Sequence, residues 1–188
     1  MTTAILSRPS DAISIRRATP ADVPAMAALI EASARALGSG YYDDRALTAA
    51  IDGVFGVDSM LVADGTYFVA EIDGAMAGCG GWSRRGTLFG SDRFIGRADD
   101  LLDPATSPAR IRAMFVAPAF ARRGVGSAIL RAGQDAARAA GFTAVELMAT
   151  LSGVDFYRER GFVAAPETFV AVGDATVVFI PMHKHLSA

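Results

Sequence analysis

Residues 115–130 carry the clearest chemical signal in this chain of 188 residues. An apolar segment there ends in a short turn, and two glycines, Gly124 and Gly126, open an alanine-rich segment of helical character. Glycines let the backbone approach a ligand closely, and the first turn of a helix offers N–H groups without intrahelical partners at the positive end of its dipole. Such an arrangement suits a phosphate or pyrophosphate, and Arg122 and Arg123 add positive charge beside it.

A simpler interpretation needs no ligand. Glycine is common at helix ends and turns, so a capped helix with two solvated arginines would explain the same residues. Two familiar phosphate motifs fit poorly, because a Walker loop needs a lysine that this segment lacks, and Ile129 stands where a dinucleotide-binding loop has its third glycine. A phosphate site here must therefore be of another type.

A second segment, from Phe156 to Phe162, places Tyr157 on a short helix that we expect to end at Gly161. A phenolic hydroxyl can donate a proton to a reacting group, whereas packing is the more common role of an aromatic residue taken alone. These residues by themselves leave both roles open.

The elements that must position these segments follow from apolar periodicity and turn residues. We expect strands at residues 13–18, 67–71, 75–83, 111–116, 144–149, 169–172 and 176–180, and helices at 23–37, 44–51, 124–140 and 154–160. Strands and helices do not alternate strictly, so the chain is predicted to be α/β with a mixed rather than a purely parallel sheet. Residues 1–12 are expected to be a flexible N-terminus, and 13–188 a single domain.

Residues 84–109 interrupt this pattern with three glycines, two prolines and weak periodicity. A loop of this length inside a compact domain is usually either functional or disordered. We keep both interpretations open.

Composition excludes several classes of protein. Hydrophobic residues make up 52% of the chain and the mean hydropathy is +0.31, yet no apolar run approaches the ~18 residues that span a bilayer. The first ten residues lack the pattern of a secretory signal, so a soluble cytoplasmic protein is expected. The single cysteine, Cys79, allows neither an internal disulfide nor, alone, a zinc site, and we expect no metal. A net charge of −2 gives no general reason to bind nucleic acid or an anionic membrane.

In their order and spacing these segments resemble the GNAT superfamily of N-acetyltransferases. The family pattern opens with a strand of the form I-R-x-A-x-x-x-D, matched by residues 15–22. It continues with a strand ending in apolar-V-x-P before the turn R/Q-x-x-G-x-G/A, and then has F-Y-x-x-x-G-F, matched by 156–162. The blocks 77–83 and 147–151 resemble an uncharacterised bacterial subgroup of that family, which indicates no substrate.

The resemblance implies the GNAT fold, with about six to seven strands flanked by about four helices. It also implies transfer of an acetyl group from acetyl-CoA directly to a primary amine in a ternary complex. Carried over by position, it pairs the pantetheine arm with the main chain of Phe115 and Val116. It places the pyrophosphate on the N–H groups of Arg122, Arg123, Gly124, Val125, Gly126 and Ser127.

This chain departs from the family pattern at two positions. Ala121 stands where the family has Arg or Gln, which matters little because the turn acts through main-chain donors and Arg122 keeps the charge. Thr150 stands where many members have an Asn that contacts the cofactor, which puts that contact in doubt.

The resemblance makes Tyr157 the general acid that protonates the departing thiolate. For the acceptor it implies the first two helices and nearby loops, with Tyr41, Tyr42 and Trp82 as candidate pocket walls. Segment 84–109 is then expected to be a mobile flap over the acceptor side or an insertion without a role. The acceptor could be a small amine, an amino acid, an antibiotic or a protein amine, and a homodimer is left open.

The general base stays unassigned at this stage. Glu146 and Glu71 are candidates, although a solvated carboxylate is the simpler role for each, and a chain of water molecules would also serve. His183 and His185 are more simply solvated tail residues. Cys79 could carry an acetyl group only if a base lay beside it.

Two rival functions remain. A non-catalytic acyl-CoA-binding regulatory module would keep the glycine turn but have no need of Tyr157 or an acceptor cleft. A nucleotide-binding protein of another fold would prefer ATP or a dinucleotide to CoA.

Overall fold

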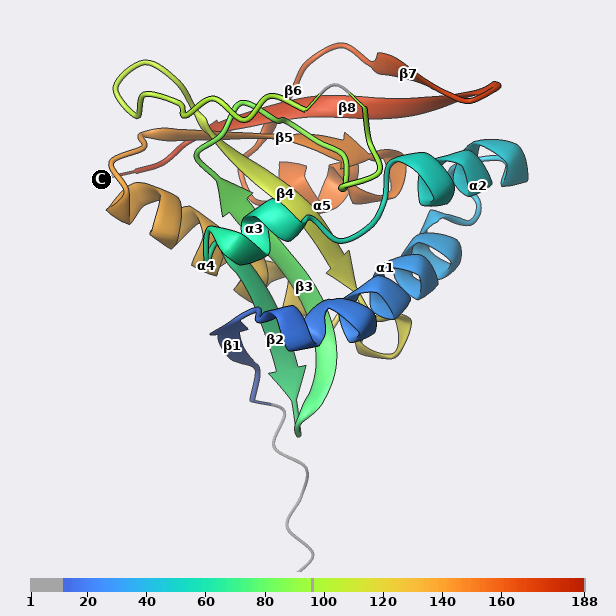
Figure 1. Cartoon of the computed structure of the whole chain (residues 1–188), viewed down its shortest axis with the longest axis horizontal. Helices are drawn as coiled ribbons and strands as arrows, with labels where there is room; N and C mark the ends of the chain where they lie inside the picture. Colours follow the sequence, from blue (N-terminus) through green and yellow to red (C-terminus); the bar gives the residue numbers. More distant parts are fainter. Residues whose placement is uncertain (1–11, 96, 188) are drawn as a thin grey trace, which may run out of the picture.

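The computed structural model describes residues 12–95 and 97–187 of the chain (Figure 1). Residues 1–11, which make up most of the expected flexible N-terminus, lie outside the described residues. The described part contains eight strands and five α-helices, so the α/β prediction is confirmed and the expected counts of six to seven and four are slightly low.

The strands form one sheet in the order β1-β2-β3-β4-β5-β8-β6, with β7 also paired to β8. Their bounds are β1 Ser14–Arg17, β2 Tyr67–Ile72, β3 Ala75–Ser83, β4 Ala109–Val116, β5 Ala144–Thr150, β6 Val163–Ala164, β7 Thr168–Val172 and β8 Ala175–His185. Neighbouring strands are antiparallel except β4 and β5, which are parallel. The sheet is therefore mixed, as the lack of strict alternation predicted.

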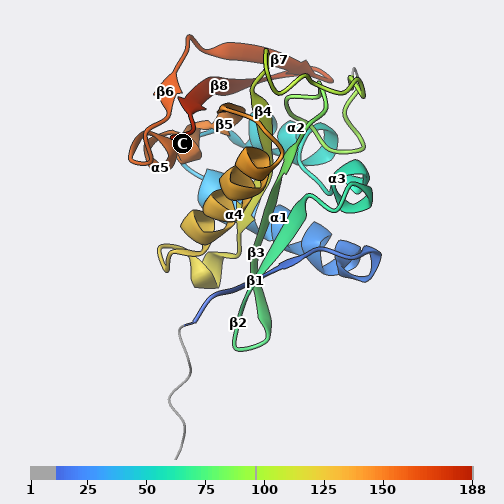
Figure 2. The ribbon, with the colours of Figure 1, turned by 90° about the vertical axis from the view of Figure 1, so that its left-hand side faces the viewer.

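The α-helices cover both faces of the sheet (Figure 2). They are α1 Val23–Gly38, α2 Asp44–Gly53, α3 Ser59–Ala63, α4 Val125–Ala139 and α5 Val154–Arg158, with short 3-10 turns at Pro20–Asp22, Pro118–Phe120 and Leu151–Gly153. Figure 2 shows α1, α2 and α3 on one face and α4 and α5 on the other. The α4 helix buries Val125, Ile129 and Leu130 against the sheet, which fixes the position of its N-terminus.

The parallel pair β4 and β5 separates soon after it begins. Register partners join only Ala109 to Val145 and Arg110 to Glu146, although β4 runs on to Val116. Figure 1 shows β5 crossing near the top of the molecule while β4 descends away from it. The C-terminal half of β4 therefore has a partner strand on one side, β3, and an open edge on the other.

An irregularity in β4 lies where the two strands part. Cys79 pairs with Phe115 but Gly81 pairs with Arg112, so β4 holds one residue more than β3 across this span. Ala113, inside it, has a φ of 52°, which is uncommon for a residue with a side chain. This β-bulge bends the strand locally and leaves Ala113 and Met114 without register partners on β3.

Two elements were not expected, and a third is longer than expected. The α3 helix is one turn long, capped by the side chain of Asp58, and β6 has two residues, so neither leaves a strong periodic pattern. The β8 strand continues past the predicted end at residue 180 to His185. His183 and His185 are therefore strand residues paired with β5, not residues of a loose tail.

The described residues of this loop, 84–95 and 97–108, contain no helix and no strand, but they are attached to the rest of the protein at several points. An isolated bridge joins Arg85 to Leu101, and the Arg85 guanidinium donates to both carboxylate oxygens of Asp64 at 2.7 and 2.8 Å. The N–H of Ser91 donates to the carbonyl of Val54 at 2.8 Å. The loop thus has a defined course over the sheet.

None of the helices within residues 12–95 and 97–187 is long and apolar enough to span a membrane. The same residues hold no cluster of three or more His, Cys, Asp or Glu side chains suited to a metal ion.

Candidate active site

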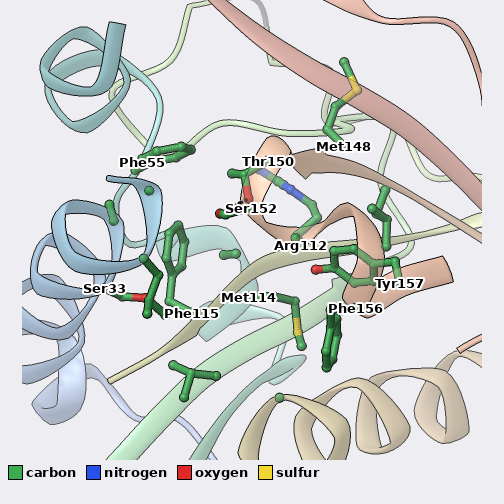
Figure 3. A pocket seen from close by; sticks show the side chains of 18 of the residues that line it. Ser33, Phe55, Arg112, Met114, Phe115, Met148, Thr150, Ser152, Phe156 and Tyr157 are labelled. Atoms are coloured by element: carbon green, nitrogen blue, oxygen red, sulfur yellow. Dashed lines mark hydrogen bonds between the residues drawn. The ribbon is translucent and has the colours of Figure 1, made fainter. Parts of the chain in front are cut away.

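A cavity of about 740 Å³ occupies the gap between the diverging strands. Its lining comes from α1, α2, the loop at 88–91, β4, the start of α4, the end of β5 and α5 (Figure 3). Cavities of several hundred Å³ are typical of ligand sites, and this one lies where the sheet offers an unpaired strand edge. Of the residues proposed from sequence, those that line it are Tyr41, Tyr42, Phe115, Val116, Arg122, Gly124, Val125, Gly126, Ser127 and Tyr157.

The open edge of β4 forms one wall. Phe115 and Val116 belong to the part of the strand that β5 does not pair, so their main-chain groups on that side lack a strand partner. Such an edge can accept an extended ligand through main-chain hydrogen bonds, as an added strand would.

The turn before α4 forms the next wall. Arg122 and Gly124 both have a left-handed backbone, with φ values of 63° and 85°, and Gly124 caps the helix. Glycine adopts this conformation without strain, which explains the residue type at position 124. The first-turn N–H groups of α4 have no intrahelical partners and lie at the positive end of the helix dipole, where an anion is stabilised.

Arg123 behaves differently from its neighbours. Its guanidinium carbon lies 5.3 Å from the centre of the Phe120 ring, and the residue does not line the cavity. Its side chain is therefore placed on the ring rather than in the cavity.

Arg160 is a cation of this site that the sequence analysis missed. Its guanidinium lies 3.8 Å above the centre of the Phe156 ring and donates to the Ser127 hydroxyl from Nε and Nη2, at 3.1 and 2.8 Å. Phe156 in turn packs against Gly126, where an added Cβ would lie 3.2 Å from two ring carbons. The spacing of four between Phe156 and Arg160 could have indicated this contact from the sequence, because residues i and i+4 meet on one face of a helix.

Tyr157 is packed at its ring and directed into the cavity at its hydroxyl. The ring contacts Phe156 and Phe162 edge to face, with centres 5.0 and 5.5 Å apart. Figure 3 shows the hydroxyl pointing from α5 into the cavity. Burial raises the pKa of Tyr157 above its ordinary value, and the charge of Arg160 opposes that shift only in part. The phenol therefore stays protonated at neutral pH.

The end of β5 presents two hydroxyls to the same cavity. Thr150 Oγ1 and Ser152 Oγ are 3.2 Å apart and share a hydrogen bond, and both residues line the cavity. A hydroxyl can donate as well as accept, so this pair offers the hydrogen-bonding capacity that an Asn amide would supply.

Tyr42 has a structural role that the sequence did not reveal. Its hydroxyl donates to the carbonyl of Val178 at 2.8 Å and accepts from the N–H of Leu151 at 2.9 Å. Burial raises the pKa of Tyr42 to about 12, and the hydrogen bond from Leu151 counteracts this shift in part. Tyr42 therefore connects the segment between α1 and α2 to β8 and to the end of β5 while its ring lines the cavity.

The other two proposed acceptor residues differ. Tyr41 lines the cavity but is 56% exposed, which places it at the rim. Trp82 is buried in the core against Phe142 and does not line the cavity. The expectation of Trp82 as a pocket wall is corrected by its position on the α4 side of the sheet.

A buried ion pair fastens the loop to the sheet beside the cavity. Arg112 of β4 lines the cavity and pairs with Asp58 at 2.7 Å, and Arg97 pairs with the other oxygen of Asp58 at 2.9 Å. Arg112 also donates to the carbonyl of Gly90. Burial lowers the pKa of Arg112, and the charge of Asp58 opposes that change.

The candidate bases from sequence lie elsewhere. Glu71 pairs with Arg16 and Glu146 pairs with Arg110, and neither glutamate lines the cavity. His183 and His185 are likewise absent from its lining. Cys79 is fully buried, and burial raises the pKa of its thiol to about 12, so it is an unreactive core residue.

Comparison with known proteins agrees with this geometry. The model of the acetyltransferase (GNAT) family matches residues 28–162. A GCN5-related N-acetyltransferase from Rhodopseudomonas palustris has a similar structure, with a TM-score of 0.68, 22% identity and coverage of 98% of this chain and 100% of the other. No curated protein matches the chain in sequence.

Two further solved structures have the same fold. The PaiA N-acetyltransferase from Thermoplasma acidophilum, solved in complex with coenzyme A, has a TM-score of 0.63 at 14% identity, with 93% and 99% of the two chains covered. The ribosomal-protein-alanine N-acetyltransferase from Brucella melitensis has a TM-score of 0.62 at 18% identity, with 92% and 99% covered. Since the family model spans well over half of its residues and these folds agree, the chain belongs to the acetyltransferase (GNAT) family and is an acyltransferase.

Proposed function

We propose that this protein transfers the acetyl group of acetyl-CoA directly to a primary amine, with both substrates bound at once. The observation that carries the proposal is the cavity itself. It joins an unpaired strand edge at Phe115 and Val116 to a cationic, glycine-containing helix start within one continuous lining.

The chemistry of acetyl-CoA fits these residues. Its pantetheine arm carries amides that can pair with the open edge of β4, and the hydroxyls of Thr150, at the end of β5, and Ser152, in the turn after it, would face that arm from the other side. Its pyrophosphate would lie on the first-turn N–H groups of α4, with Arg122 and Arg160 supplying charge-assisted donors.

In the proposed reaction the neutral amine nitrogen forms a bond to the acetyl carbon and releases one proton, the carbon–sulfur bond breaks, and the thiolate takes up one proton. Tyr157 would donate that proton, since its hydroxyl points into the cavity and remains protonated. Met114 lines the cavity at the bulge, where it has no register partner on β3, and its main-chain N–H would stabilise the developing oxyanion. Holding both reactants in one cavity supplies much of the acceleration.

Ligand-induced stabilisation tests the binding half of the proposal. At a hundredfold excess over its dissociation constant, acetyl-CoA should stabilise the folded protein by about 2.7 kcal/mol, and adenosine by much less. A thermal shift with ATP but none with acetyl-CoA would contradict it.

Turnover tests the catalytic half. Release of free CoA in the presence of a panel of amines is the expected result. Binding of acetyl-CoA without turnover of any amine would instead favour the regulatory acyl-CoA-binding module.

A further inference from the structure

The acceptor end of the cavity is built from aromatic and aliphatic side chains. We use the name acceptor chamber for the part lined by Leu37, Tyr42, Phe55, Phe89, Phe115 and Phe179. Four of its rings form a connected series, with centres 5.6 Å apart for Phe55 and Phe115, 6.2 Å for Phe55 and Phe179, and 5.7 Å for Phe89 and Phe179.

The charges around the cavity have one predominant sign. The charged residues among the described lining are Arg112, Arg122, Arg160 and Glu159, and its remaining titratable groups are Tyr41, Tyr42 and Tyr157. Glu159 lies beside Arg160, at 3.4 Å, and so belongs to the phosphate end. The carboxylate of Asp58 is fully buried behind Arg112 and paired with it. The described lining of the acceptor chamber thus contains no carboxylate and no imidazole.

This arrangement disfavours a protonated amine. Moving an ammonium ion from water into an apolar chamber without a counter-charge costs free energy, and Arg112, the nearest charged group of the described lining, is a cation already paired with Asp58 and supplies no counter-charge. An alkylamine with a pKa near that of lysine, about 10.4, is neutral in only about one molecule in 2,500 at pH 7. The described lining of the acceptor chamber also provides no carboxylate or imidazole that could remove the extra proton.

We propose that the acceptor is an amine of low basicity on an aromatic or apolar body, one that is already neutral at pH 7. The inference rests on the proposed acetyltransferase function and names its substrate class. A neutral amine enters without losing a charged hydration shell, and the rings of Phe55, Phe89 and Phe179 then contact its body. The nitrogen loses a single proton on acetylation, which matches the single proton that the departing thiolate needs.

Two isomeric amines test the proposal with size and composition held constant. In 4-methylaniline the amino group is attached to the ring and is neutral at pH 7, whereas in benzylamine it is attached to a methylene carbon and is protonated. With the full-length protein and saturating acetyl-CoA, kcat/KM for 4-methylaniline should exceed that for benzylamine at least tenfold at pH 7. Spermidine, whose amino groups are protonated at pH 7, should not be acetylated.

The pH dependence separates the two amines further. For 4-methylaniline kcat/KM should be nearly flat between pH 6.5 and 8.5, whereas for benzylamine it should rise about tenfold per pH unit. In a binding measurement without turnover, 4-methylaniline should raise the melting temperature of the complex with CoA, and benzylamine should not at pH 7.

A carboxylate placed in the chamber should change the preference. Leu37 lines the chamber and is 37% exposed, so the fold should tolerate Leu37→Glu. This variant should lower the ratio of the two kcat/KM values at least fivefold, and the matched Leu37→Gln should leave it within twofold.

Failure of the proposed acceptor class can be distinguished from failure of the proposed acetyltransferase function. If acetyl-CoA binds but benzylamine or spermidine is the better acceptor at pH 7, or 4-methylaniline neither binds nor reacts, the acceptor class is wrong while the acetyltransferase proposal stands. If acetyl-CoA itself does not bind, the proposed function fails first.

Discussion

The guanidinium of Arg160 donates two hydrogen bonds to the hydroxyl of Ser127, from Nε at 3.1 Å and Nη2 at 2.8 Å. This contact links Arg160, two residues beyond the end of α5, to the first turn of α4 at the proposed pyrophosphate site. It also brings to the phosphate end of the cavity an arginine that the sequence had not indicated, whereas Arg123, which the sequence had indicated, does not line the cavity.

Replacing Arg160 should weaken binding of the phosphate-bearing part of the donor. Arg160→Gln removes the charge, and since hydrogen bonds to charged groups contribute about 1.5–3 kcal/mol, the Kd for acetyl-CoA should rise at least tenfold. S-acetylpantetheine, which lacks the phosphates, should be bound as before. Arg158→Gln is the control, because that side chain is 59% exposed and pairs with Asp155. An equal effect of both substitutions, measured by calorimetry, would remove Arg160 from the site.

Gly126 should tolerate only small side chains. An added Cβ would lie 3.2 Å from the Phe156 ring, so Gly126→Val must displace this ring together with the Arg160 guanidinium stacked on it. Acetyl-CoA affinity should therefore fall more than tenfold, and Gly126→Ala should fall between the parent and the valine variant. Gly133→Ala, farther along α4 and outside the cavity lining, should leave affinity unchanged. Unchanged binding in Gly126→Val would support the plain helix-cap interpretation.

Tyr157→Phe should separate binding from chemistry. The ring contacts with Phe156 and Phe162 remain in this variant, so acetyl-CoA affinity should change little. The turnover number should fall by about 10²-fold or more, within the range of general acid catalysis. Because burial raises the pKa of Tyr157 above its ordinary value near 10, the parent enzyme should show no loss of turnover up to about pH 9.5 from this group. A kcat equal to that of the parent, measured where chemistry limits the rate, would leave water as the proton source.

Asp58 should be essential for stability and for the shape of the cavity wall. Removing one partner of a buried ion pair leaves the other charge uncompensated, so Asp58→Asn should cost about 3–5 kcal/mol of unfolding free energy. Asp155→Asn, on a side chain that is 87% exposed, should cost almost nothing.

The same variant tests the flap hypothesis. If residues 84–109 act as a flap, the KM for the acceptor should rise more than that for acetyl-CoA in Asp58→Asn. Equal changes in both constants would argue against the flap.

Cys79 should take no part in the reaction. It is fully buried and its thiol pKa is raised to about 12 by burial, so alkylation of the native protein should be at least a hundredfold slower than that of the unfolded chain. Cys79→Ala should keep turnover within about twofold. An acetylated Cys79 detected by mass spectrometry during turnover would require a covalent mechanism instead.

Much of the fold could be predicted because long elements leave periodic patterns. The α1 and α4 helices and the β2, β3 and β5 strands lie within one residue of their predicted bounds. Short elements could not be found in this way. The α3 helix is held by the side chain of Asp58, which accepts from two N–H groups, and β6 exists only through its pairing with β8.

In the candidate site, too, residues marked by a local sequence pattern could be predicted, and residues placed by contacts distant in sequence could not. Residues of the turn at 122–127 could be proposed because their chemistry is local and depends on the backbone. The position of Trp82 could not, because the face of β3 that turns toward α4 is decided by packing against Phe142. Arg112 and Asp58 are separated by 54 positions in sequence, and no local pattern indicates that they pair.

The way residues 84–108 are fastened bears on how the range of acceptors could change over evolutionary time. Arg85, Arg97 and Arg112 anchor this segment through Asp64, Asp58 and the Gly90 carbonyl, whereas Leu88 and Phe89 lie between the anchors and face the cavity. Mutations at these two positions would reshape the chamber without removing an anchor. Substitutions at Leu88 and Phe89 can therefore change which acceptors the cavity admits while the ion pairs and the hydrogen bond that hold the segment are retained.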